Sequence, residues 1–166
     1  MIPVIIAAVV LLIDQLTKAW VLRTWPEPYT GEIPIIPGWL ALTYVQNTGV
    51  AFGLFTGFPQ FFTITSIIII IFAIHFYLKH APENQPWLAV SLGLILGGAL
   101  GNVTDRIRFG YVVDFIKTFD GRFPVFNVAD SAVVVGVLLM ALTLMYLDQQ
   151  EPARRLSPQV EAEDGR

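Results

Sequence analysis

Four long apolar blocks divide this chain of 166 residues. They run over residues 2–22, 61–78, 87–103 and 128–147. A helix needs about 20 apolar residues to cross the hydrocarbon core of a bilayer, so each block is close to the required length. Hydrophobic residues make up 55% of the chain and charged residues only 14%, which is too apolar for an ordinary soluble domain. The sequence therefore predicts an α-helical membrane protein whose four transmembrane helices form a single domain over residues 1–147.

The connection over residues 24–60 is long enough to have a structure of its own. Its segment 39–45 (WLALTYV) mixes β-branched and aromatic residues, which favours a short strand, and prolines and glycines predict turns around it. We therefore expect a small β-containing extramembrane connection between the first two spans, lying on the membrane surface. Residues 148–166 are polar and predict a disordered C-terminal tail.

Charge and cysteine content exclude several kinds of function. The net charge is −3 and no nucleic-acid-binding motif is present, so nucleic acid is not an expected partner. The chain has no Cys, and His75 and His80 have no third ligand nearby in the sequence, which argues against a thiol nucleophile and against a metal site.

Four spans put both termini on one side of the membrane. The Lys and Arg count near the spans weakly favours termini outside the cell, but charge alone does not settle the orientation.

Polar residues at membrane depth gather at one end of the predicted helices. Asp14 and Lys18 come late in the first span, and Asn102, Asp105 and Arg106 come late in the third. Asp14 and Lys18 are four residues apart, so a structural ion pair on one helix face is the simpler explanation for them. Glycines at 93, 97 and 101 form a small-residue ridge that predicts close packing of the third helix.

The segment 111–131 carries two acids between the third and fourth spans. Asp114 follows one apolar segment and Asp130 lies just inside the next, and acids at a bilayer boundary are functional candidates. Two such acids could share a proton and activate water. A plainer interpretation makes Asn127 the N-cap of the fourth helix, with Asp130 in its first turn, and Asp114 a surface loop acid.

Two other classes of protein remain alternatives at this point. A proton-coupled transporter or channel also uses intramembrane charges, but it predicts polar groups through the bilayer depth or inverted repeats. A membrane scaffold that binds partners through the glycine ridge predicts that neither acid matters for activity. The gathering of charges at one end of the spans favours an enzyme.

Five blocks of the sequence resemble the motifs of lipoprotein signal peptidase, also called signal peptidase II, and occur in that family's order. They are DQLTK at 14–18, NTGVAF at 47–52, GGALGN at 97–102 followed by Asp105 and Arg106, VVDF at 112–115, and FNVADS at 126–131. Five blocks in order are far more specific than any one of them. Only the polar tail lies outside the resemblance.

The resemblance implies a bacterial inner-membrane aspartyl protease without a cofactor. Such enzymes remove the signal peptide from diacylglyceryl-modified prolipoproteins by cutting just before the lipidated cysteine. The family's catalytic acids correspond to Asp114 and Asp130. Its other functional positions correspond to Asp14, Lys18, Asn47, Gly49, Asn102, Asp105, Arg106, Asn127 and Ala129. The resemblance also implies cytoplasmic termini, an active site near the periplasmic face, contact with membrane lipids, and inhibition by globomycin.

The sequence leaves open which acid holds the proton at rest. The first turn of a helix favours an ionised carboxylate, and this would make Asp130 the base. Asp114 lies between Val113 and Phe115, and apolar surroundings favour the protonated acid. An approach of Arg106 to Asp114 rather than to Asp105 would reverse these roles.

Overall fold

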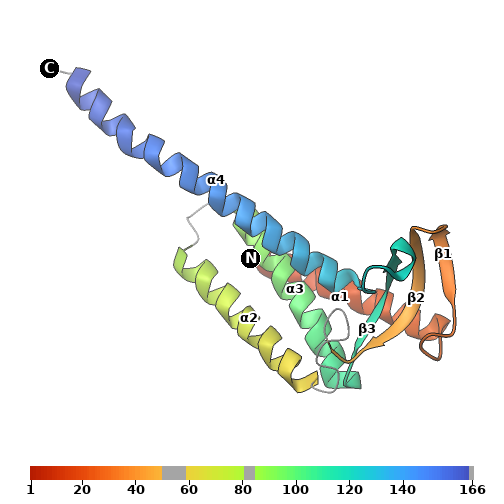
Figure 1. The fold of residues 1–166 in the computed structure, drawn as a ribbon. Helices are drawn as coiled ribbons and strands as arrows, with labels where there is room; N and C mark the ends of the chain where they lie inside the picture. Colours follow the sequence, from red (N-terminus) through yellow and green to blue (C-terminus); the bar gives the residue numbers. More distant parts are fainter. Residues whose placement is uncertain (50–58, 81–84, 165–166) are drawn as a thin grey trace.

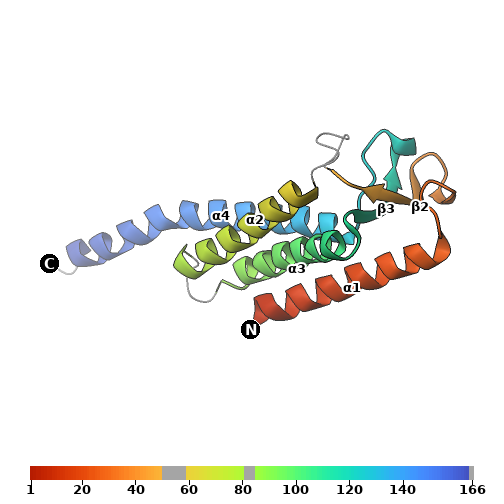
Figure 2. The same cartoon turned by 90° about the horizontal axis from the view of Figure 1, so that it is seen from below.

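The computed structural model describes residues 1–49, 59–80 and 85–164, and it contains four helices in this part of the chain. These are α1 (Ile2–Thr24), α2 (Pro59–His80), α3 (Pro86–Phe109) and α4 (Val128–Asp164). Helix α3 lies between α1 and α4 and packs against both, while α2 packs on another side of α3 (Figure 1). A small sheet lies at one end of the bundle, and the N-terminus and C-terminus lie away from it (Figure 2).

Glycines on α3 allow both neighbouring helices to approach closely. A Cβ on Gly97 would lie 2.7 Å from Cβ of Val10 in α1, and a Cβ on Gly98 would collide with the carbonyl oxygen of Ala129 in α4. Apolar surface gives little drive for helix association inside lipid, so such close contacts carry much of the packing energy. The predicted small-residue ridge on the third helix is confirmed.

Three helices in the described part of the chain are long and apolar enough to cross a membrane. They comprise Ile2–Thr24, Pro86–Phe109 and Val128–Gln150. The apolar stretch of α2, Ile64–Lys79, is shorter than these three helices. A membrane protein is therefore confirmed, and the count of four spans stays a prediction.

The small sheet has three antiparallel strands in the order β1-β2-β3. Strands β1 (Glu32–Ile36) and β2 (Leu40–Asn47) belong to the connection between α1 and α2, and β2 confirms the strand expected over residues 39–45. Strand β3 (Val112–Thr118) follows α3 and was not predicted. Asp114 therefore lies on a strand paired with Val45 of β2, and its side chain is buried, so it is not the surface loop acid of the plainer interpretation.

A compact apolar cluster fixes the sheet on the end of α1. Val21 of α1 and Trp25, the C-cap of this helix, pack with Tyr44 of β2 and with Val113 and Phe115 of β3, and all five are buried. Burial of one large apolar side chain is worth about 1.5–3 kcal/mol. The cluster therefore holds β3 in one place relative to the helices, on both sides of Asp114.

Helix α4 continues beyond the expected end of the span near residue 147. Its last residue is Asp164, so the structure has a helix where the sequence predicted a disordered tail over 148–166. Gln, Glu, Arg and Ala are frequent after residue 148, and these residues favour helix. The division into a domain over 1–147 and a separate tail stays a prediction.

Candidate active site

Asn127 connects the two candidate acids at the start of α4. Its side-chain nitrogen donates to Oδ1 of Asp114 at 2.7 Å, and its side-chain oxygen accepts the backbone N–H of Asp130 at 2.8 Å. In return, Oδ2 of Asp130 accepts the backbone N–H of Asn127 at 3.2 Å. This reciprocal arrangement is a capping box, which confirms Asn127 as the N-cap and Asp130 as a first-turn residue. The same cap therefore orients both acids.

Asn102 of α3 joins the second acid to a buried lysine. Its side-chain nitrogen donates to Oδ1 of Asp130 at 2.7 Å. Its oxygen accepts from Nζ of Lys18 at 3.0 Å and from the side chain of Asn127 at 3.1 Å. These contacts fix the direction of the amide, because its oxygen faces only donors and its nitrogen faces a carboxylate.

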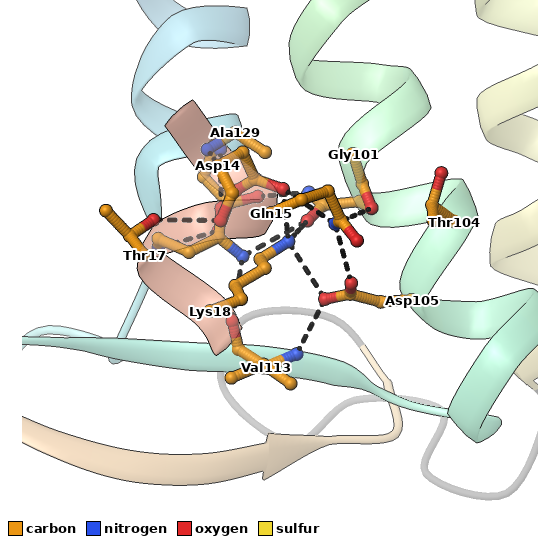
Figure 3. A network of polar contacts seen from close by, with 12 residues as sticks. Asp14, Gln15, Thr17, Lys18, Gly101, Thr104, Asp105, Val113 and Ala129 are labelled. Carbon is orange, nitrogen blue, oxygen red and sulfur yellow. Dashed lines mark hydrogen bonds and ion pairs between the residues drawn. The ribbon is translucent and has the colours of Figure 1, made fainter. Parts of the chain in front are cut away.

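Lys18 forms ion pairs with two buried acids, one from its own helix and one from α3 (Figure 3). Its Nζ lies 2.9 Å from Oδ2 of Asp14 and 2.9 Å from Oδ2 of Asp105. With the contact to Asn102, all three ammonium protons have an acceptor. The expected Asp14–Lys18 pair is confirmed, and Asp105 is a second partner that helix spacing could not reveal.

The two buried acids also hold backbone amides of the site. Oδ1 of Asp14 accepts the N–H of Ala129 at 3.1 Å, and Oδ2 of Asp105 accepts the N–H of Val113 at 3.0 Å. Both carboxylates come from the helix bundle, whereas Val113 belongs to the sheet and Ala129 to the first turn of α4. The charged groups therefore connect separate elements, in keeping with the structural role expected for them.

Asn47 and Gly49 approach the site from the end of β2. The side-chain nitrogen of Asn47 donates to Oδ2 of Asp114 at 2.7 Å, and its oxygen accepts the N–H of Gly49 at 3.0 Å. Both oxygens of Asp114 thus accept an amide donor. Residues 50–52 of the NTGVAF motif lie outside the described residues.

A cleft of about 590 Å³ opens beside the two acids. Asn47, Gly49, Arg106 and Asp130 contribute to its wall. Apolar side chains complete the lining, including Phe126, Val134 and Val135. Asp130 thus faces the cleft, while the side chain of Asp114 is only 1% exposed and lies behind it. The charge of Arg106 acts on Asp130, Asp114 and Asp105 together.

Burial raises the pKa of Asp114 to about 7, and repulsion by Asp130 adds to this effect. The amide donors of Asn47 and Asn127 act in the opposite direction because they stabilise the carboxylate. A carboxyl with a pKa near neutrality can both hold and release a proton at physiological pH. No cluster of three or more His, Cys or acidic residues able to hold a metal ion occurs within 1–49, 59–80 and 85–164.

Hydrogen bonds and ion pairs among the described residues connect the acids, the amides, the lysine and the backbone N–H groups that the sequence singled out. Arg106 forms part of the cleft wall together with Asp130. Sequence reasoning missed the contribution of Gln15. Its side chain donates to Oδ1 of Asp105 at 3.0 Å and to Oδ2 of Asp14 at 3.2 Å. The sequence signal that could have indicated this contribution is the position of Gln15 inside the DQLTK block.

Comparisons with known proteins give matches that cover most of the chain. A family model described as Signal peptidase (SPase) II matches residues 6–146. Lipoprotein signal peptidase of Pelotomaculum thermopropionicum is 47% identical over 143 residues, which cover 85% of this chain and 90% of the relative. The enzyme of Halothermothrix orenii is 45% identical over 148 residues, which cover 89% and 95%. A solved bacterial membrane enzyme has a TM-score of 0.79 at 37% identity, and the match covers 90% of each chain. The chain therefore belongs to the signal peptidase II family and is a protease.

Proposed function

We propose that this protein is a membrane-embedded aspartyl endopeptidase that removes the signal peptide from diacylglyceryl-modified prolipoproteins, cutting just before the lipidated cysteine. The observation that carries the proposal is the joint orientation of Asp114 and Asp130 by Asn127 beside an open, largely apolar cleft. Membership of the signal peptidase II family supports the substrate class.

Asp130 acts as the base and Asp114 as the acid in the proposed reaction. Asp130 takes a proton from a water molecule, whose oxygen then adds to the scissile carbonyl carbon. Protonated Asp114 donates to the carbonyl oxygen and stabilises the tetrahedral intermediate. The proton on Asp130 then passes to the leaving nitrogen of the lipidated cysteine as the peptide bond breaks. At the same step one hydroxyl of the intermediate returns its proton to Asp114, which restores the starting state of both acids.

The cleft suits a substrate that arrives from the bilayer. Val134 and Val135 of α4 line it and are each more than half exposed, so the apolar wall continues onto the outer surface of the bundle. Acyl chains and the apolar signal peptide gain free energy when they contact such a wall instead of water. Globomycin is expected to occupy the same cleft.

The proposed location is the bacterial inner membrane, with cytoplasmic termini and the site near the periplasmic face. The sheet lies at the end of the bundle that is distant from both termini (Figure 2), and Asp114 belongs to its strand β3. This supports a site on the opposite side of the membrane from the termini.

The test is cleavage of a diacylglyceryl-modified prolipoprotein by the purified protein in detergent. We expect Asp114→Asn and Asp130→Asn each to abolish cleavage while melting temperature stays close to wild type, because an amide can fill neither role. Asp148→Asn, a matched change at an exposed position of α4, should cleave normally. The unmodified prolipoprotein should be cut poorly. Turnover by either dyad variant at the wild-type rate would contradict the mechanism, and equal rates on the two substrates would contradict the lipid requirement.

A further inference from the structure

The two buried acids outside the proposed dyad, Asp14 and Asp105, each contact the residue that directly precedes one of the catalytic aspartates. Asp14 accepts the N–H of Ala129, which directly precedes Asp130. Asp105 accepts the N–H of Val113, which directly precedes Asp114. Each of these contacts therefore holds the backbone N–H of the residue that directly precedes a catalytic aspartate. Movement of either buried carboxylate would be transmitted to the catalytic acid through a single residue.

Gln15 connects these two buried acids through one amide group (Figure 3). Its Nε2 lies 3.0 Å from Oδ1 of Asp105, 3.2 Å from Oδ2 of Asp14 and 3.4 Å from the carbonyl oxygen of Gly101. Its Oε1 accepts from the guanidinium of Arg108 at 3.2 Å. Arg108 carries donors only, so it requires the oxygen of the amide to face outward and the nitrogen to face the two carboxylates.

The charges of the cluster explain why a neutral donor is needed there. Asp14 and Asp105 are two carboxylates with a single buried ammonium, that of Lys18, between them. Lys18 has used its three protons on these acids and Asn102. A carboxylate has about four lone-pair sites, so each acid can accept further donors. Gln15 supplies N–H groups to both acids without adding charge.

We propose that Gln15 is a positioning residue that couples the two catalytic aspartates, by holding Asp14 and Asp105 against the backbone N–H groups of the residues that directly precede Asp130 and Asp114. The inference rests on the proposed dyad for its effect on activity, but the coupling itself is a property of the cluster. Gln15 does not line the cleft that faces Asp130 and so acts only through other residues.

The coupling is tested without substrate by amide hydrogen exchange in detergent micelles. Gln15→Met keeps the length of the side chain and removes its donors. We expect the Val113 and Ala129 amides to exchange about tenfold faster in this variant, because their acceptors lose a restraint. Gln149→Met makes the same chemical change at an exposed position of α4 and should leave both amides as in wild type. Unchanged exchange at both amides of Gln15→Met would overturn the coupling.

The effect on activity is measured separately with the modified prolipoprotein. We expect kcat to fall about 10- to 100-fold in Gln15→Met while KM changes less than about twofold, because misplaced catalytic groups slow the reaction without weakening binding. Gln15→Glu should lose more, since a third carboxylate would face Asp14 and Asp105. A rise in KM at unchanged kcat, or a wild-type rate in both variants, would overturn the positioning role. A wild-type protein that fails to cleave would refute the proposed function, and the exchange result would still decide the coupling.

Discussion

The side-chain nitrogen of Asn127 lies 2.7 Å from Oδ1 of Asp114, although the two residues are on different elements. Asn127 is at the same time the N-cap of α4, through its oxygen and the N–H of Asp130. Asn127 therefore caps the helix through its amide oxygen and contacts a proposed catalytic acid through its amide nitrogen. Substitutions of Asn127 can remove one of these contacts and keep the other.

Asn127→Ser should retain the cap and lose the amide donor, because serine is a good N-cap residue. Loss of a hydrogen bond to the neutral, protonated Asp114 costs about 0.5–1.5 kcal/mol, so kcat/KM should fall about 2- to 13-fold. Asn127→Ala should lose as much activity and, in addition, about 1 kcal/mol of stability from the missing cap. Kinetics and thermal melting of the two variants check this. A Ser variant with wild-type kcat/KM would show that only the cap matters.

Asn47→Ala should change the pH dependence of cleavage. Asp114 must be protonated to act as the acid, and its pKa of about 7 predicts that kcat/KM falls as pH rises through about 7. The amide of Asn47 lowers that pKa, so its removal should raise the pKa and move the falling limb of the profile to higher pH.

The control for this shift is Gln46→Ala. Gln46 is the preceding residue on β2, and successive side chains of a strand point to opposite faces. Its side chain contacts Tyr44 and not Asp114, so the falling limb should stay at the wild-type pH. A limb that moves to lower pH in Asn47→Ala would mean that Asp114 does not work as the acid.

The sequence could predict the parts of the site that depend on helix spacing. Residues four apart share a helix face, which identified the Asp14–Lys18 pair. Asn127 with Asp130 has the spacing of a capping box, and these contacts are present. Antiparallel helices also predicted that the polar residues of α1, α3 and α4 would meet at one end.

The parts of the fold and of the site that the sequence could not predict depend on contacts between distant segments of the chain. VVDFIKT at 112–118 is rich in β-branched residues, but only its pairing with β2 makes it a strand, and that pairing joins residues about 70 positions apart. The contacts of Asp105 with Lys18 and with Val113 likewise require the packed bundle. The role of Gln15 was not visible for the same reason, because three of its four partners lie on α3.

Gly98→Ala should destabilise the protein by about 1–3 kcal/mol, the usual cost of adding a methyl group to a tightly packed interface. The new Cβ would collide with the carbonyl oxygen of Ala129, and a backbone atom cannot rotate away. Thermal melting in detergent measures the loss. Ala141→Val adds more volume at an exposed position of α4 and should melt within experimental error of wild type. Equal melting temperatures for Gly98→Ala and wild type would mean that α3 and α4 are not in contact at this point.

The last prediction concerns which acid holds the proton in the resting enzyme. Oδ1 and Oδ2 of Asp130 accept from Asn102 and from the backbone N–H of Asn127, and the first turn of a helix favours a negative charge by about 0.3–1 kcal/mol. Arg106 adds a positive charge on the same side of the cleft. These groups stabilise an ionised Asp130.

Asp114 has the opposite balance and should carry the proton. Its side chain is buried, and repulsion by an ionised Asp130 further opposes a second negative charge. Its two amide donors do not reverse this balance, and its pKa stays near 7. Infrared difference spectra of wild type against Asp114→Asn and Asp130→Asn resolve the two carboxyl groups. Below pH 7 the band of the protonated carboxyl should vanish in Asp114→Asn and persist in Asp130→Asn. In Asp130→Asn the neighbouring negative charge is gone, so the carboxylate of Asp114 becomes more favourable and its titration moves to lower pH. A band that vanishes in Asp130→Asn at every pH would exchange the roles of acid and base, because the proton would then reside on the residue that faces the cleft.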